Sequence, residues 1–202
     1  MQIDLRDVMK KQDVIDYFDR YAPQWDADMV RHEAVISSIL DNGGITEGVS
    51  VLDVACGTGV LIPDYLQRNV VSVTGVDISP KMITIAEEKF SQPNVHFVCS
   101  DVETVVFETS FDRIVVYNAF PHFFDPSNLI EALAGYLKPG GMLTVAHGMS
   151  RTAINHHHEG SASKVSIELM DADDLEKLFE PYCDVVVKIS DDRMYQVAGV
   201  KK

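Results

Sequence analysis

Between residues 49 and 148, short runs of β-branched and other apolar residues alternate with longer amphipathic stretches. The apolar runs occupy residues 49–55, 70–77, 94–101, 111–120 and 142–148. Strand-length runs that alternate with helix-length stretches are typical of βαβ units, whose parallel strands are buried on both faces. This pattern predicts an α/β fold in which helices cover both faces of a mostly parallel sheet.

The C-terminal part of the chain follows a different pattern. After a predicted helix over residues 172–181, two strand-like runs at 185–190 and 193–200 are separated by little more than Asp191 and Asp192. That spacing is typical of a β-hairpin. We therefore expect a seven-stranded sheet that is closed by an antiparallel C-terminal hairpin.

The length of 202 residues is typical of one domain, which we expect to span residues 1–202. Within it we expect an N-terminal helical cap or lid (1–45), a ligand-binding core (46–148), an insertion (149–170), and a terminal helix with the hairpin (171–202). Aromatic residues Tyr17, Phe18, Tyr21 and Trp25 are spaced for one helix face in the N-terminal part. They either pack on the edge of the sheet or form a lid over a ligand.

The charge of the chain limits its partners. Its 17 basic and 31 acidic residues give a net charge of −14, and the sequence contains no cluster of lysine and arginine. Nucleic acids and anionic membranes would be repelled by most of such a surface, so we expect a small-molecule partner. We find no secretory signal or membrane-spanning run, and the three cysteines show no metal-ligand spacing. These features predict a cytoplasmic protein, either a monomer or a homodimer.

The sequence VLDVACGTGV at residues 51–60 places small residues directly after the first predicted strand. In open α/β sheets, ligands bind beyond the carboxyl ends of the strands. The dinucleotide fingerprint G-x-G-x-x-G is excluded because Ile62 stands where its third glycine should be, and the G-K-[ST] ending of a phosphate-binding loop is absent. Asp77 ends the second strand, 18 residues after Gly59, where a carboxylate can accept hydrogen bonds from ribose hydroxyls.

The motif V-L-D-V-A-C-G-T-G, together with L-K-P-G-G before the fifth strand, resembles the class I S-adenosylmethionine-dependent methyltransferases. The segment YFDRYAPQWD and the chain length are most similar to the small-molecule branch that contains quinone-biosynthesis C-methyltransferases. The resemblance covers nearly the whole chain. It implies a Rossmann-like fold, S-adenosyl-L-methionine as cofactor, S-adenosyl-L-homocysteine as product, and a methyltransferase reaction.

The resemblance also implies roles for individual residues. Asp53 would support the methionine moiety, and Ala55 replaces the first glycine of the family motif with its carbonyl still available to the methionyl amine. Gly57 and Gly59 would let the chain pass close to the cofactor. The other implied cofactor-binding residues are Asp77 and Ile78 at the ribose, Asp101 and Val102 at the adenine, and Asn118 and Ala119 beside the sulfonium.

The acceptor should lie past the fourth and fifth strands, where His122 and His147 are placed. A general base near neutral pH is commonly a histidine. Further candidates for the acceptor pocket are Tyr17, Tyr21, Trp25, Phe120, Phe123, Arg151 and His156. The aromatic residues among them predict an apolar or aromatic acceptor.

Three interpretations of the histidines remain open. They are surface or structural residues, or His122 or His147 is the catalytic base, or a metal is bound by His122, His147 and one or two of His156, His157 and His158. Two alternative functions follow: a non-catalytic protein that binds S-adenosylmethionine or S-adenosylhomocysteine, and a metal-binding or metalloid-handling protein.

Overall fold

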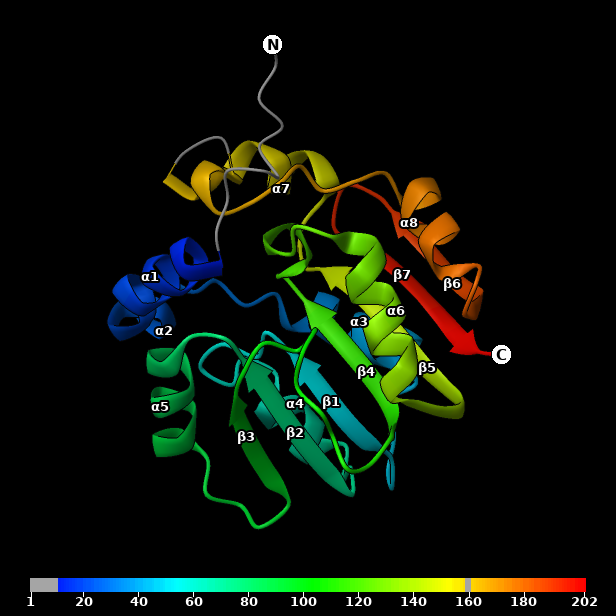
Figure 1. The fold of residues 1–202 in the computed structure, drawn as a ribbon, viewed down its shortest axis with the longest axis horizontal. Helices are drawn as coiled ribbons and strands as arrows, with labels where there is room; N and C mark the ends of the chain where they lie inside the picture. The colour runs from blue at the N-terminus through cyan, green and yellow to red at the C-terminus, as the bar shows by residue number, and fades with distance from the viewer. Residues whose placement is uncertain (1–10, 159–160) are drawn as a thin grey trace.

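The structure is a computed structural model that describes residues 11–158 and 161–202, without the side chains of residues 158 and 161. Seven strands form one sheet in the order β3-β2-β1-β4-β5-β7-β6 (Figure 1). The strands are β1 (Ser50–Val54), β2 (Ser72–Asp77), β3 (Val95–Cys99), β4 (Phe111–Tyr117), β5 (Leu137–His147), β6 (Cys183–Ser190) and β7 (Tyr195–Lys201). The first five strands are parallel, whereas β7 is antiparallel to both β5 and β6. The predicted α/β fold with its C-terminal hairpin is confirmed.

The order of the strands reverses at β1, which pairs with β2 on one side and with β4 on the other. Chain connections leave the sheet in opposite directions at such a point, so a crevice opens beyond the carboxyl ends of the two strands. The glycine-containing loop after β1 therefore borders the crevice in which a ligand is expected.

Two hydrophobic clusters cover the two faces of the sheet. On one face, residues of α6 (Pro126–Tyr136) and α8 (Ala172–Phe179) pack on the sheet. On the other face, residues of α3 (Glu33–Asn42) and α4 (Ile62–Gln67) do so. Figure 1 shows α6 and α8 in front of the strands in that view.

Two helices begin where the Ser-Pro and Asp-Pro pairs of the sequence place them. The Ser79 hydroxyl accepts a hydrogen bond of 3.2 Å from the Met82 backbone N–H, at the start of α5 (Pro80–Lys89). The Asp125 carboxylate accepts one of 3.0 Å from Asn128 before α6. Each side chain satisfies a backbone donor that the first helical turn would leave unpaired.

The predicted run at 111–120 is longer than the strand that the structure contains. β4 ends at Tyr117 because Asn118 adopts a left-handed conformation with a φ of 54°. A short 3-10 helix, η3 (Phe120–His122), follows it. This turn directs the loop after β4 across the end of the sheet, where the crevice lies.

The N-terminal segment lies beyond the carboxyl ends of the strands. It consists of α1 (Lys11–Tyr21), η2 (Ala22–Gln24) and α2 (Trp25–Asp28), and α7 (Arg151–His158) lies at the same end of the molecule (Figure 1). Val14 of α1 is buried against Ala162, which belongs to η4 (Ser161–Lys164), and Val165, which follows η4. The N-terminal helix thus packs on the insertion between β5 and α8 and on the loops that border the crevice.

Candidate functional site

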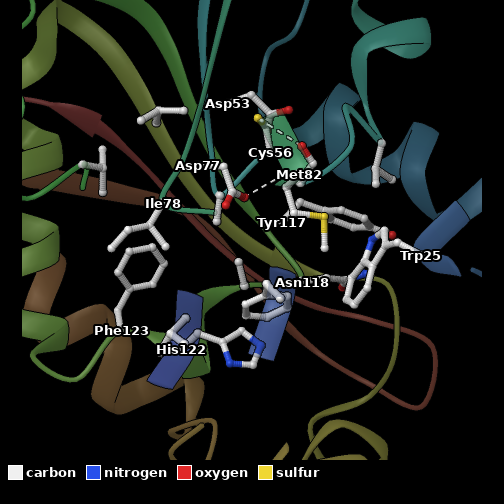
Figure 2. Close-up of a pocket in the computed structure, with 18 of the residues that line it drawn as sticks. Trp25, Asp53, Cys56, Asp77, Ile78, Met82, Tyr117, Asn118, His122 and Phe123 are labelled. Atoms are coloured by element: carbon white, nitrogen blue, oxygen red, sulfur yellow. Dashed lines mark hydrogen bonds between the residues drawn. The ribbon is translucent and has the colours of Figure 1, made fainter. Parts of the chain in front are cut away.

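A cavity of about 450 Å³ lies between the carboxyl ends of the strands and the N-terminal segment. That volume is within the usual range for small-molecule and cofactor sites. Its walls come from α1 and α2, from the loops after β1, β2, β3 and β4, and from α7. Figure 2 shows Asp77, Asn118 and His122 around this cavity, with Trp25 and Phe123 on opposite sides of it.

The loop after β1 is held by the carboxylate of Asp77. One oxygen of Asp77 accepts a hydrogen bond of 2.9 Å from the Gly57 backbone N–H, and the other accepts one of 2.8 Å from the Ser79 N–H. Asp77 lines the cavity but is only 8% exposed. Burial raises its pKa to about 6, because a desolvated carboxylate binds its proton more tightly. Each carboxylate oxygen keeps acceptor capacity for a further donor.

Two residues of this loop adopt positive φ values and line the cavity: Ala55 at 53° and Gly57 at 55°. A Cβ on Gly57 would have only Trp25 within 4 Å, at 3.9 Å. Ala55 stands where the family motif has its first glycine. The left-handed conformation at this position costs alanine about 1–2 kcal/mol relative to glycine.

Gly59 does not line the cavity, so the structure gives no support to its predicted contact with the cofactor. Its φ is 82°, and a Cβ added to it would stand 2.6 Å from the ring of Phe90. Glycine is needed at this position because the loop packs closely against Phe90, the residue that follows α5.

We expect Gly59→Ala to lower the free energy of unfolding more than Gly48→Ala does. Gly48 has nearly the same φ of 81° but nothing within 4 Å of its Cβ position, so it reports the backbone strain alone. That strain costs about 1–2 kcal/mol, and overpacking against Phe90 adds about 1–3 kcal/mol at Gly59. Urea unfolding of both variants measures the difference. Equal losses would show that Phe90 yields without cost.

Asp53, at the floor of the cavity, is almost completely buried. The hydroxyl of Tyr65 donates a hydrogen bond of 3.3 Å to its carboxylate. Burial, together with the smaller effect of the nearby charges of Asp77 and Asp64, raises the pKa of Asp53 to about 8. An acid in this environment gains stability from a cationic ligand beside it, such as an ammonium group.

The raised pKa values of Asp53 and Asp77 predict that the ligand-free protein is more stable in mild acid. A carboxyl whose pKa is higher in the folded state contributes stability below its unfolded value of 3.8, and that stability is lost as the pH rises through the folded value. The loss therefore develops above pH 3.8 and is complete near pH 6 for Asp77 and near pH 8 for Asp53. We expect the Tm of the ligand-free protein to be higher at pH 5.5 than at pH 8.5.

The matched variant for this prediction is Asp53→Asn. Its amide carries no charge, so the part of the pH dependence that extends between about pH 6 and pH 8, above the range of Asp77, should disappear while the general effect of the acidic surface remains. An unchanged Tm profile in this variant would assign the pH dependence to the surface charges.

Past β3, Asp101 and Val102 line the cavity as predicted for residues near an adenine. One Asp101 oxygen accepts a hydrogen bond of 3.0 Å from the Glu103 N–H, and the other accepts one from the ammonium of Lys11. Lys11 also donates to Glu103 at 2.8 Å. The first residue of α1 is thus tied to the loop after β3.

Past β4, Asn118 and Ala119 line the cavity, as does Ile78 past β2. The left-handed conformation of Asn118 lets its side-chain oxygen accept a hydrogen bond of 2.9 Å from the Gly148 N–H. This contact joins the loops after β4 and β5 beside the cavity.

His122 lines the cavity, whereas His147 does not. The Nδ1 of His122 lies 2.8 Å from the Val165 carbonyl oxygen. A carbonyl can only accept, so Nδ1 carries the proton and Nε2 carries the lone pair of the neutral ring. The ring also stacks edge-on against Phe18, with 4.9 Å between the centroids.

The prediction that His147 faces the acceptor is corrected by its position in β5. The strand extends to His147, which pairs with Tyr195 of β7, and the side chain is fully buried in the interior. The two rings lie edge-to-face, 6.1 Å apart. A sequence pattern that places a residue at the end of a strand does not show on which face the strand's last side chain lies.

Of the predicted acceptor-pocket residues, Tyr17, Tyr21, Trp25 and Phe123 line the cavity. Phe120, Arg151 and His156 do not. Phe120 is 1% exposed and belongs to the core cluster beneath the sheet's α6 face. Arg151 donates to the Leu169 carbonyl at 2.8 Å and pairs with Glu168, so it holds the insertion together.

The structure does not assemble the proposed metal site. His157 lines the cavity with His122, but His156 is exposed outside it and His147 lies in the interior. The side chain of His158 lies outside the described residues. In the part of the chain that the structure describes, no group of three histidine, cysteine or acidic side chains could hold a metal ion. Nor is any described helix long and apolar enough to span a membrane.

The sequence did not identify Arg31, Tyr117 and Met82, which also line the cavity. Arg31 donates a hydrogen bond to the Val60 carbonyl and another, of 2.8 Å, to the Asp64 carboxylate. Its guanidinium therefore lies against the loop after β1. No local pattern marks a single arginine in the connection between two helices. Met82 lies on the buried face of α5, where an apolar residue carries no signal of a ligand.

Four further contacts of acidic side chains tie the N-terminal segment to the loops around the cavity. Asp19 accepts hydrogen bonds from the Ser79 hydroxyl at 2.6 Å and from the Lys81 N–H at 3.2 Å. Asp26 accepts from the Thr58 hydroxyl at 2.5 Å and pairs with Lys89 at 2.6 Å. With Lys11, these contacts join the segment to the loops that follow β1, β2 and β3.

The fold and the cavity at the switch in strand order define a Rossmann-like α/β cofactor-binding protein. Residues 51–141 match the family model described as a methyltransferase domain. The chain is 29% identical over 158 residues to a malonyl-[acyl-carrier protein] O-methyltransferase of Acetivibrio thermocellus, a match that covers 75% of this chain and 56% of that protein. It is 36% identical over 100 residues to a ubiquinone biosynthesis O-methyltransferase of Coxiella burnetii, covering 48% of this chain and 42% of that one.

Among solved structures, a putative methyltransferase of Haloferax volcanii, in complex with the Trm112 methyltransferase activator, superposes with a TM-score of 0.76. The two sequences are 20% identical, and the match covers 91% of this chain and 97% of that one. The matched segment, residues 51–141, is a methyltransferase domain similar to those of the class I S-adenosylmethionine-dependent methyltransferases, whose cofactor is S-adenosylmethionine. It spans about half the length of the curated relatives that it matches.

Proposed function

We propose that this protein transfers a methyl group from S-adenosylmethionine to a small-molecule acceptor that is apolar or aromatic. The observation that supports this most is the composition of one cavity. Asp77 and the loop after β1 line it at one end, and His122 lines it among aromatic side chains from α1. A methyl donor and an acceptor need to meet in such a compartment, with water excluded.

The residues at the strand ends fit the cofactor. Asp77 is a buried carboxylate facing the cavity with acceptor capacity left, and we assign the ribose hydroxyls to it. We assign the adenine amine to Asp101 and the methionyl ammonium to Asp53. Burial disfavours the charged form of Asp53, and a cation beside the carboxylate would stabilise that form. The left-handed backbone at Ala55 and Gly57 exposes peptide groups to the same ligand.

When bound, S-adenosylmethionine supplies an electrophilic methyl carbon on a sulfonium. The chain's own contribution is to orient the acceptor and to remove its proton. We assign the proton transfer to Nε2 of His122, since the Val165 carbonyl holds the proton on Nδ1. A phenol or enol presented to Nε2 loses its proton as its oxygen attacks.

We also infer that the N-terminal segment is a lid. It supplies Tyr17, Tyr21 and Trp25 to the cavity wall and is tied by Lys11, Asp19 and Asp26 to the three cofactor loops. Entry of a cofactor requires that some of these contacts open. The core, the insertion and the lid then act as one domain.

The test is calorimetric titration with S-adenosylhomocysteine, followed by a screen of phenols, enols and thiols for release of S-adenosylhomocysteine from S-adenosylmethionine. Micromolar binding and turnover of at least one acceptor would support the proposal. Tight binding without turnover of any acceptor would favour the non-catalytic alternative. No binding at all would refute the assigned function. Native mass spectrometry of the same sample reports whether the protein is a monomer or a homodimer and whether it carries a metal.

A further inference from the structure

We propose that the hydroxyl of Tyr117, together with the guanidinium of Arg31, binds the amino-acid carboxylate of the cofactor. This assignment rests on the proposed function and concerns the end of the cavity opposite the adenine.

The position of Tyr117 follows from the alternation of side chains along β4. Val116 belongs to the core on the α6 face, whereas Tyr117 packs against the cluster that contains Ile36 and Leu61 on the other face. Tyr117 lines the cavity, and its hydroxyl lies directly against Gly148, where a Cβ would collide with it. The hydroxyl is therefore confined to a small space at the ends of β4 and β5.

The direction of the cofactor places its carboxylate at this end. With the adenine beside Asp101, past β3, and the ribose beside Asp77, past β2, the amino-acid part extends past β1 towards β4. Asp53, which belongs to β1 and lines that end, suits the ammonium group and repels the carboxylate.

Two donors at this end suit a carboxylate. The Arg31 guanidinium donates to the Val60 carbonyl, to Asp64 at 2.8 Å and to Glu33 at 2.9 and 3.2 Å, which holds it against the loop after β1. These contacts leave the second N–H of its Nη1 for a ligand oxygen. Burial raises the pKa of Tyr117 above its ordinary value, against the smaller effects of a hydrogen bond with Asn118 and of the Arg31 charge, so the hydroxyl stays protonated and can donate. A charged guanidinium and a neutral hydroxyl together can satisfy both oxygens of one carboxylate.

The experiment compares two ligands that differ only at this end. Wild type, Tyr117→Phe and Tyr195→Phe are titrated with S-adenosylhomocysteine and with 5′-methylthioadenosine, which lacks the amino-acid group. Tyr195 is a matched control because it is a buried strand tyrosine that does not line the cavity. We expect Tyr117→Phe to weaken S-adenosylhomocysteine binding by about 10- to 100-fold, the range for a hydrogen bond to a charged group. Binding of 5′-methylthioadenosine should stay within twofold, and Tyr195→Phe should change neither.

Gly148→Ala gives an independent test, since its methyl group displaces the hydroxyl without removing it. It should reproduce the selective loss. Equal weakening of both ligands in Tyr117→Phe would overturn the assignment, as would no weakening of either. A loss confined to acceptor turnover would also overturn it and place the hydroxyl at the acceptor. If wild type binds neither ligand, the proposed function itself fails, a result distinct from all of these.

Discussion

Replacing His122 by asparagine is expected to lower the turnover number by about 10²- to 10⁴-fold, the usual contribution of a general base. Asparagine keeps an N–H donor in position to reach the Val165 carbonyl, which lies 2.8 Å from Nδ1 in the structure, and removes the nitrogen that carries the lone pair. The measurement is steady-state release of S-adenosylhomocysteine with the acceptor that wild type converts fastest. Because His122 is assigned to the acceptor, the affinity for S-adenosylhomocysteine should stay within about threefold.

The control for this prediction is His156→Asn, since His156 is exposed and lies outside the cavity. It should keep wild-type turnover. The loss in His122→Asn should also diminish at high pH for an acidic phenol that ionises without help. If His122→Asn keeps wild-type turnover, the imidazole is not the base. Its role would then be to pack α1 on the insertion, through Phe18 and Val165.

Replacing Asp77 by alanine is expected to weaken S-adenosylhomocysteine binding by at least about 100-fold, because two charge-assisted hydrogen bonds to the ribose are lost. The structure adds a second consequence. Asp77 also accepts the N–H groups of Gly57 and Ser79, so its removal leaves two backbone donors without their acceptor. Each costs about 1–3 kcal/mol if water does not replace the carboxylate. We therefore expect a measurable loss of stability in this variant as well.

Asp77→Asn separates the two roles. Its amide oxygen still accepts one of the backbone N–H groups, so urea unfolding should detect a smaller loss of stability than in the alanine variant, while the charge that holds the ribose is gone. Calorimetric titration of both variants should find similarly weak binding. Wild-type affinity in either would refute the ribose assignment and leave Asp77 as a structural link between two loops.

Much of the fold followed from local features of the sequence. The alternation of apolar runs with amphipathic stretches predicted the parallel core, because strands buried on both faces need continuous apolar residues. The Ser79-Pro80 and Asp125-Pro126 pairs marked helix starts that depend on neighbouring backbone atoms only. The loop after β1 and the acids after β2 and β3 were likewise predictable, since each directly follows a strand end that the sheet brings to one edge.

The acceptor side of the cavity depended on contacts between distant parts of the chain. His122 and His147 both follow or end strands, yet pairing with β7 buries His147 while the turn at Asn118 carries His122 into the cavity. Arg31 and Tyr117 reach the cavity only because α3 packs on the sheet beside β4. The periodicity of a sequence specifies which residues share a face of one element, whereas the packing of elements decides which of those faces meet. The sequence therefore determined the sheet and the loops that follow its parallel strands, and only the tertiary structure decided which side chains surround the proposed position of the acceptor.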